Sequence, residues 1–269
     1  QATTAPGDLV IREFRLRGPS STADEYVVIH NRTATDITVA ASDASAGFGV
    51  ASSDGNLLFA IPNGTVIPAR GHFLGVNSTG YSLGGGQDAA WTTDLGDGAG
   101  IGIFTSTTTF SAPNLLDAVG FTGGSAPFIE GVGLPVLSTN GEYAWIRKGP
   151  NGTVQDTNSN LGTGANTGDF TLIATDGAIY NGIQSILGAP SPTKSGTRDT
   201  YAGVSGSLIE PLVGVNLNPN RVHLTNAPGD RLEFRRRLTN NTGATLHALR
   251  LRFMVLATYW SPGYEVPTQ

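Results

Sequence analysis

The chain has 269 residues, a formal net charge of −5, 37 glycines and no cysteine; 39% of its residues are hydrophobic and only 14% are charged. The hydrophobic share excludes a disordered chain, the glycines disfavour long helices, and the absence of cysteine excludes disulfides and thiolate metal sites. No apolar run reaches the roughly 18 residues of a membrane span, so the composition predicts a soluble, turn-rich, all-β protein of about two domains.

The chain from residue 8 to residue 190 predicts a β-sandwich, preceded by an N-terminal arm at residues 1–7. Segments rich in Gly, Pro, Asn, Asp, Ser and Thr separate the expected strands, and these residues favour turns. No stretch keeps an apolar period of 3.6 residues, so very little helix is expected. The expected strands are residues 9–17, 25–31, 36–41, 57–61, 72–76, 100–104, 115–121, 142–147 and 170–174.

A boundary follows this first domain. Pro190 and Pro192 remove backbone donors and end any sheet, so residues 191–198 are interpreted as a linker.

Residues 199–269 predict a second, smaller β-unit. Residues 231–235 and 249–253 alternate apolar and charged side chains, as a strand with one wet face does. The unit has about 70 residues, fewer than the roughly 100 of a complete immunoglobulin-like sandwich. It is therefore expected to be an incomplete β-sandwich that something else completes.

Positive charge is concentrated near the end of the chain. Residues 1–198 hold 9 basic and 16 acidic residues, a net of −7, whereas residues 199–269 hold 7 and 5, a net of +2. The alternatives are solvated strand faces, or a basic tail that meets an acidic body within one molecule or between neighbours. Nucleic acid is not expected, because no recognition motif accompanies the arginines.

Several short motifs follow one another in a particular order along residues 8–192. They are LVIREF at 9–14, DEYVVIHN at 24–31, IPNGTVIP and GHFL within 61–74, DGAGI at 97–101, LDAVG at 116–120, QDTNSN at 155–160, DF at 169–170 and GAP at 188–190. In this order they resemble the bacterial secreted lamin-tail domain family. The resemblance implies an immunoglobulin-like β-sandwich without a catalytic site, in surface, adhesive or structural roles or as an accessory module of secreted enzymes. Residues 238–244 are similar to immunoglobulin-like domains that follow such modules.

The chain departs from the family in the second strand. Val28 stands where family members often have an acidic residue, and the usual Trp is missing near Gly47 and Phe48. Because residues 26–29 are then apolar on both faces, we expect another domain or a neighbouring subunit to cover the second face. An exposed Trp260 would also be costly, which favours an interface. The residues expected at interfaces are Tyr26, Val28, Arg235, Arg237, Arg250, Arg252, Tyr259, Trp260 and Tyr264.

The sequence carries no pattern typical of an enzyme. It lacks the His-Glu-x-x-His, Gly-x-Ser-x-Gly and Gly-x-x-x-x-Gly-Lys motifs, and its four histidines are scattered. Asp156, Asn158 and Asn160 place oxygens at alternate positions, which suits Ca²⁺; the alternative is turn formation. No other cofactor is expected. Trp91, in a polar loop, is either a platform for a glycan or packed over the loop.

Two functions are consistent with these features. The chain begins with Gln1 rather than Met, which favours export with signal-peptide cleavage and an extracellular or cell-surface location. The first function is a structural subunit of an extracellular filament or surface assembly, built by head-to-tail contacts and strand complementation between copies. The alternative is a monomeric, non-catalytic module that binds glycan or cell wall.

Overall fold

The structure is a computed structural model, and it describes residues 4–83, 86–149, 154–162, 168–187, 190–195, 221–224 and 231–234. These residues belong to two units, one within residues 4–195 and one that holds the strand pair within residues 221–234. The 3-10 turn η1 (Ala112–Asn114) is the one helical element among the described residues, and all other regular elements there are strands, which confirms the all-β prediction. No helix in this part of the chain is long and apolar enough to cross a membrane.

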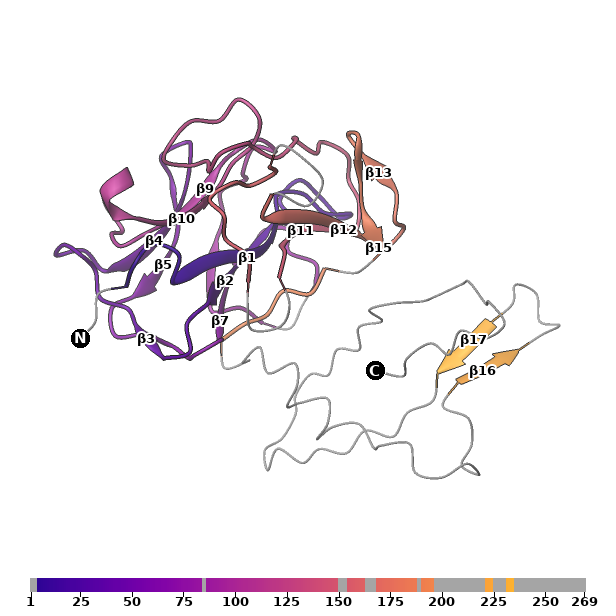
Figure 1. Ribbon diagram of the computed structural model, residues 1–269, viewed down its shortest axis with the longest axis horizontal. Helices are drawn as coiled ribbons and strands as arrows, with labels where there is room; N and C mark the ends of the chain where they lie inside the picture. The colour runs from indigo at the N-terminus through magenta and orange to yellow at the C-terminus, as the bar shows by residue number, and fades with distance from the viewer. Residues whose placement is uncertain are drawn as a thin grey trace, which may run out of the picture. The chain divides into compact units, whose positions relative to one another are not determined.

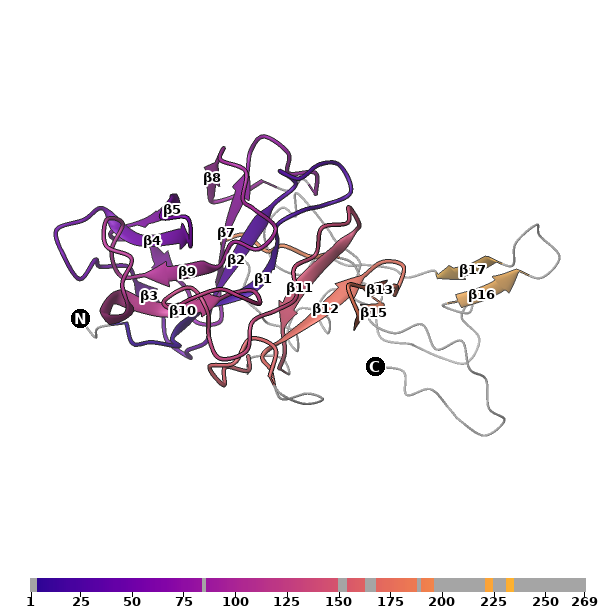
Figure 2. The ribbon, with the colours of Figure 1, turned by 90° about the horizontal axis from the view of Figure 1, so that it is seen from above.

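The first unit is a sandwich of two facing sheets (Figures 1 and 2). The larger sheet has the strand order β15-β12-β11-β1-β2-β7-β8, and its neighbours are antiparallel except β12 with β15 and β7 with β8. Its strands are β1 (Leu9–Arg15), β2 (Tyr26–Asn31), β7 (His72–Asn77), β8 (Ala89–Trp91), β11 (Tyr143–Arg147), β12 (Phe170–Ala174) and β15 (Ile186–Leu187).

The smaller sheet has the order β10-β9-β4-β5 and lies to the left in Figure 2. Its strands are β4 (Gly47–Ser52), β5 (Leu57–Pro62), β9 (Ile101–Phe104) and β10 (Leu115–Val119). Two short pairs accompany the sheets: β3 (Ile37–Thr38) with β6 (Val66–Ile67), and β13 (Ile179–Tyr180) with β14 (Ile183–Gln184).

The main core lies between the two sheets. Strands alternate their side chains between faces, so each sheet contributes one apolar face. Phe14 and Ile29 of the larger sheet share this core with Val50 and Ile103 of the smaller one. Trp145 is buried in the same core, as its strand pattern predicts.

The outer face of the larger sheet is also apolar and covered. Tyr26 and Val28 are only 0% and 1% exposed. Their burial confirms that this face is covered, but side chains of the same unit pack against it. The interface prediction for Tyr26 and Val28 is therefore corrected, because both lie inside the chain. The cluster comprises Tyr26, Val28, Leu74, Val76, Ala144 and Ile173, with Tyr81, Leu83 and Ile146 packed against it.

Residues 190–195, here named the strap, cross this outer face. They follow β15 at one edge of the larger sheet, and the Ser191 N–H donates to Glu13 Oε1 on β1 at 2.6 Å. The Ser195 N–H donates to Oδ2 of Asp88, directly before β8 at the opposite edge, at 2.6 Å. The strap is the orange segment that runs below β2 towards β7 in Figure 1.

The strap corrects the predicted linker. Pro190 and Pro192 are both buried, so residues 191–195 of the interval 191–198 belong to the sandwich. The two prolines end strand pairing as expected, but an extended segment that lacks two of its backbone donors can still lie on an apolar sheet face.

The N-terminal arm is bonded to the sandwich from Gly7 onward. The Gly7 N–H donates to the Leu116 carbonyl on β10 at 2.8 Å, and the Arg32 N–H donates to the Asp8 carbonyl at 2.9 Å. This part of the arm is thus held by its own unit.

The described part of the second unit is one antiparallel pair, β16 (Arg221–Leu224) and β17 (Arg231–Phe234). The register runs from Arg221 opposite Phe234 to Leu224 opposite Arg231. β17 confirms the strand predicted at residues 231–235. The strand predicted at 249–253 lies outside the described residues, as do the predicted interface residues Arg235, Arg237, Arg250, Arg252, Tyr259, Trp260 and Tyr264.

Candidate functional site

Arg147, at the end of β11, is fully buried, which is rare for a charged side chain. A β-bulge between Ile11 and Glu13 interrupts β1, and the β1–β11 ladder pairs only Glu13 and Phe14 of β1. Arg147 Nε donates to the Ile11 carbonyl at 2.9 Å, and the Ile11 N–H donates to Asp117 Oδ2 at 2.7 Å. Ile11 is paired with Ile29 on β2 but has no partner on β11, and the side chains of Arg147 and Asp117 take the place of that partner.

Four carboxyl groups surround the Arg147 guanidinium. Its Nη2 lies 2.7 Å from both oxygens of Asp117. Its Nη1 lies 3.4 Å from Asp156 and 3.4 Å from Asp169. Glu130 completes this group, which we call the Arg147 cluster, and among the described residues its buried Oε2 has no hydrogen-bond partner.

The cluster holds more acidic than basic groups, and the pKa values reflect this. Burial raises the pKa of Glu130 to about 8, and the charges of Asp117 and Asp156 add to the effect. Burial also raises the pKa of Asp117 to about 6, although Arg147 acts in the opposite direction. At neutral pH, Glu130 therefore keeps a proton that an exposed glutamate would release.

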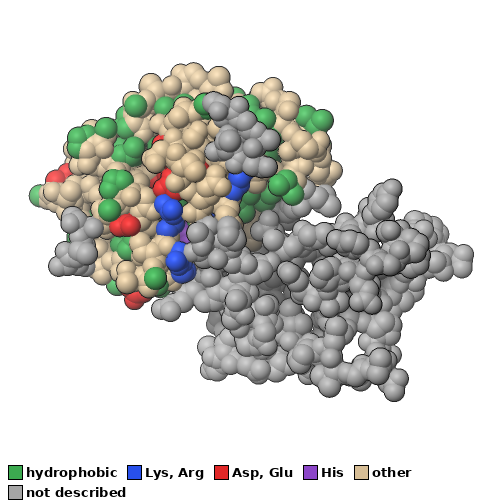
Figure 3. Space-filling model, in the orientation of Figure 1, with side chains coloured by type: hydrophobic (Ala, Val, Ile, Leu, Met, Phe, Trp, Pro, Cys, Tyr) green, Lys and Arg blue, Asp and Glu red, His purple; other side chains and the backbone are tan. Residues whose placement is uncertain are grey.

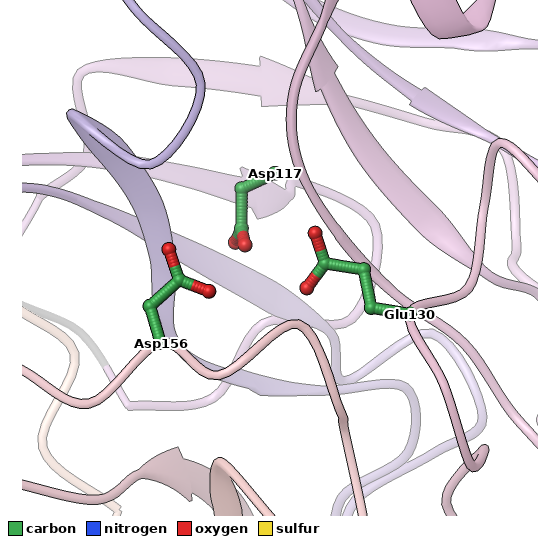
Figure 4. A group of neighbouring side chains, drawn as sticks. All are labelled: Asp117, Glu130 and Asp156. Atoms are coloured by element: carbon green, nitrogen blue, oxygen red, sulfur yellow. The ribbon is translucent and has the colours of Figure 1, made fainter.

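Three of these carboxyl groups also have the spacing of cation ligands. One oxygen from each of Asp117, Glu130 and Asp156 lies within 4.8 Å of the others, and Figure 4 shows the three groups turned towards one another. Both Asp117 oxygens accept from Arg147, while the two Asp156 oxygens accept from Arg147 and Arg32. A cation would have to displace the guanidinium, so this donor set favours a proton on Glu130 over a metal.

The structure places the three predicted calcium ligands in different surroundings. Asp156 lies in the Arg147 cluster. Asn160 is buried, and its Oδ1 accepts from the backbone N–H groups of Gly120 at 2.9 Å and Glu130 at 3.1 Å. Asn158 has a φ of 55°, a left-handed conformation that asparagine tolerates in turns. Asn158 and Asn160 thus shape the loop, whereas Asp156 stands beside the carboxyl groups of Asp117 and Glu130.

A second buried arginine, Arg15 at the end of β1, has balanced partners. Its Nη2 pairs with Asp24, and its Nη1 lies 2.9 Å from Glu142. The hydroxyls of Ser20 and Ser82 donate to Asp24 at 2.6 and 2.7 Å. Burial alone would raise the pKa of Asp24, but the hydrogen bonds from these serines and the charge of Arg15 lower it.

Trp91 is packed in the core, so its predicted role as a sugar platform is wrong and the packing alternative is confirmed. The side chain is 5% exposed, and its ring stacks on Phe59 with 5.7 Å between centroids. Its Nε1 donates to Glu25 at 3.2 Å. Pairing of β8 with β7 draws this polar segment onto the sandwich and turns the indole inward.

A pocket of about 380 Å³ adjoins the Arg147 cluster. It lies where the N-terminal arm, the segment after β2, the segment before β7 and the loop at 154–162 meet. Arg32, Arg70, Asp8 and Asp156 are its charged lining residues. Asp156 belongs to both the pocket and the cluster.

Sequence reasoning singles out Asp156 but not Arg147, Asp117 or Glu130, although a signal exists for Arg147 and Asp117. Tyr143, Trp145 and Arg147 alternate along β11, so the period that buries the two aromatic rings also turns Arg147 inward. Asp117 likewise stands inside the apolar run of β10. A charged residue at an inward position of a strand is therefore the feature to look for.

Comparisons with protein-family models, curated proteins and solved structures gave no match to this chain. The site is therefore interpreted from its own geometry.

Proposed function

We propose that the chain is an exported, non-catalytic structural protein, a subunit of an extracellular filament or surface assembly. In this proposal the sandwich is an immunoglobulin-like domain of the lamin-tail type. The C-terminal unit is completed by a strand from a neighbouring copy, so that contacts repeat head to tail.

One observation carries the proposal: β16 and β17 form an antiparallel pair in a unit separate from the sandwich. A two-stranded pair is marginally stable alone in water, and its outer edges present unpaired N–H and C=O groups. In the sequence, the apolar Leu232 and Phe234 alternate with the charged Arg231 and Glu233, which is the pattern of a strand with one apolar face. An added strand would extend the ladder and help to cover the apolar face.

The N-terminal arm is less suited to be the donor strand. The bonds of Gly7 to Leu116 and of Asp8 to Arg32 hold its end on its own sandwich. The proposal therefore rests on the β16–β17 pair rather than on the arm.

Electron microscopy and sedimentation of the complete chain over a range of concentrations test the proposal. Wild type should form regular filaments or larger species, and Leu232→Lys should abolish them. Leu57→Lys is the matched control, because Leu57 is 42% exposed on β5 of the sandwich and should tolerate the charge. A wild type that stays monomeric throughout, or equal effects of both substitutions, would overturn the proposal.

A monomeric, non-catalytic binding module is the second candidate function. The pocket that contains Arg32 and Arg70 favours it, because two guanidinium groups beside open volume can hold an anionic ligand. Retention of the chain on immobilised acidic polysaccharide, lost when Arg70 is replaced, would support this function.

A further inference from the structure

Basic side chains are unevenly distributed over the face of the sandwich drawn in Figure 3. Figure 3 shows Lys and Arg side chains gathered in a short column on the face drawn, beside acidic ones. Arg32 and Arg70 both line the pocket of about 380 Å³, within the range of small-molecule sites. Two arginines share this pocket in a chain whose net charge is −5.

Arg32 has an open hydrogen-bonding edge. Both of its side-chain bonds use Nη1, which donates to the Gly7 carbonyl at 3.0 Å and to Asp156 Oδ2 at 2.7 Å. Within the described part of the chain, Nε and Nη2 make no bond, and the side chain is 29% exposed. The Nε–Nη2 edge is one of the forks with which arginine binds a carboxylate through two parallel hydrogen bonds.

Arg70 is held in a strained backbone conformation at the same pocket. Its φ is 59°, in the left-handed region that glycine and asparagine adopt at lower cost. Its Nη1 donates to the Arg32 carbonyl, which fixes the stem and leaves the other guanidinium N–H groups without a bond among the described residues. Strained residues cluster at functional sites, and here the strained residue supplies a second guanidinium.

The remaining lining residues suit a hydroxylated ring. Asp8 and Asp156 lie in the same pocket, and their carboxylates can accept hydrogen bonds from hydroxyl groups. Pro6 and Val154 add apolar surface for the C–H groups of a sugar. Arginines for a carboxylate, carboxylates for hydroxyls and apolar contacts together describe a sugar acid.

We propose that this pocket binds a uronic acid unit of an acidic polysaccharide, with its carboxylate between Arg32 and Arg70. The assignment rests on the binding-module function and not on assembly. A monomeric chain that binds uronate would overturn only the filament proposal, and a filament without uronate affinity would overturn only this one.

Calorimetric or NMR titration of the complete chain with D-glucuronate tests the assignment, with D-glucose and inorganic phosphate as comparison probes. Glucuronate should bind saturably, glucose should not, and added salt should weaken the binding. Arg70→Asn removes the guanidinium and keeps a residue that accepts the left-handed φ, so the fold should survive. It should weaken binding by about tenfold, the effect of losing one charge-assisted contact. Arg17→Asn is the matched control, because Arg17 pairs with Asp97 and does not line the pocket.

Three results would overturn the assignment. They are no saturable binding of glucuronate, equal affinity in Arg70→Asn and wild type, and binding of phosphate without binding of glucuronate. The last result would identify a general oxyanion site. If Arg70→Asn fails to fold, Arg70→Lys replaces it; the charge then stays, the fork is lost, and glucuronate affinity should still fall.

Discussion

The sandwich buries two arginines completely, and their surroundings differ in charge balance. Arg15 is paired with Asp24 inside and with Glu142 nearer the surface, while serine hydroxyls complete the shell of Asp24. Arg147 stands among Asp117, Asp156, Asp169 and Glu130, and the last of these keeps a proton to limit the repulsion.

The comparison shows that a buried arginine can have two different roles. Around Arg15 the carboxylate has a lowered pKa, so the ion pair is satisfied across the ordinary pH range. Around Arg147 the pKa values of Asp117 and Glu130 are raised, so the protonation state changes close to neutral pH. The Arg15 ion pair therefore keeps its charge state over this pH range, whereas the charge state of the Arg147 cluster depends on pH.

The largest expected effect comes from Arg147→Met. The substitution leaves the Ile11 carbonyl without a donor and the buried carboxylates without a counter-charge. Breaking a buried ion pair in this way costs about 3–5 kcal/mol in the free energy of unfolding. Urea denaturation measures the loss, with Arg17→Met as the surface control expected to cost at most about 1 kcal/mol. A loss as small as that of the control would mean that the cluster is not held by Arg147.

Arg15→Met should have a smaller effect, about 2–3 kcal/mol, below the usual range for a buried pair. Asp24 keeps its hydrogen bonds from Ser20 and Ser82, and the Glu142 side chain, which is part-exposed, can turn towards water. The same denaturation experiment ranks the two variants. Equal or reversed losses would contradict the distinction drawn between the two sites.

Glu130→Gln should change the pH dependence of stability. The folded pKa of Glu130, about 8, exceeds its ordinary value of 4.5, so the folded state binds more protons between these pH values. The contribution of Glu130 to wild-type stability therefore falls as pH rises through this window, by at most about 1.4 kcal/mol per unit. The variant should lose this slope and gain stability relative to wild type above pH 8.

Melting temperatures measured from pH 5 to pH 9 check this result. Asp176→Asn is the control, because the Ala178 N–H lowers the pKa of this exposed carboxyl group, so the substitution should leave the slope above pH 5 unchanged. Parallel pH profiles of Glu130→Gln and wild type would show that Glu130 is ionised in the folded state.

The smallest expected effect is a gain of calcium response. In wild type the Arg147 guanidinium occupies the space between Asp117 and Asp156, so Ca²⁺ should not change the melting temperature. In Arg147→Met the three carboxylates become available to the cation. Calcium at several times its Kd should then raise the free energy of unfolding of the variant by about 1 kcal/mol. Stabilisation of wild type by Ca²⁺ would show instead that the cluster accepts a metal beside Arg147.

Much of the sandwich follows from strand alternation, and the strands that the sequence does not predict have a physical reason for escaping prediction. All nine strands expected within residues 9–174 appear near their expected places, because their apolar residues recur with period two, although the one expected at residues 36–41 is only the two-residue β3. β4 was not predicted, since Gly47 and Gly49 interrupt its pattern. At Gly49 a Cβ atom would lie 2.6 Å from the Ser106 carbonyl oxygen, so the close approach of the chain there requires glycine.

The candidate site could be predicted only in part. Asp156 was singled out through its spacing from Asn158 and Asn160, but its real partners are distant in sequence. Asp117 and Arg147 reach it only through the β-bulge of β1 and the facing of β10 and β11. A local motif search cannot find such a cluster, because the register of the sheets assembles it.

The strap has a mechanical consequence. A force that pulls on the chain beyond Ser195 would meet the bonds to Asp88 first and the bond to Glu13 next, before it reached β15. These anchors would open one after another rather than together. The six strap residues would then release roughly 20 Å of extended chain, at about 3.3–3.6 Å each. The strap would thus lengthen under tension as an elastic tether, while the two sheets beneath it stayed folded.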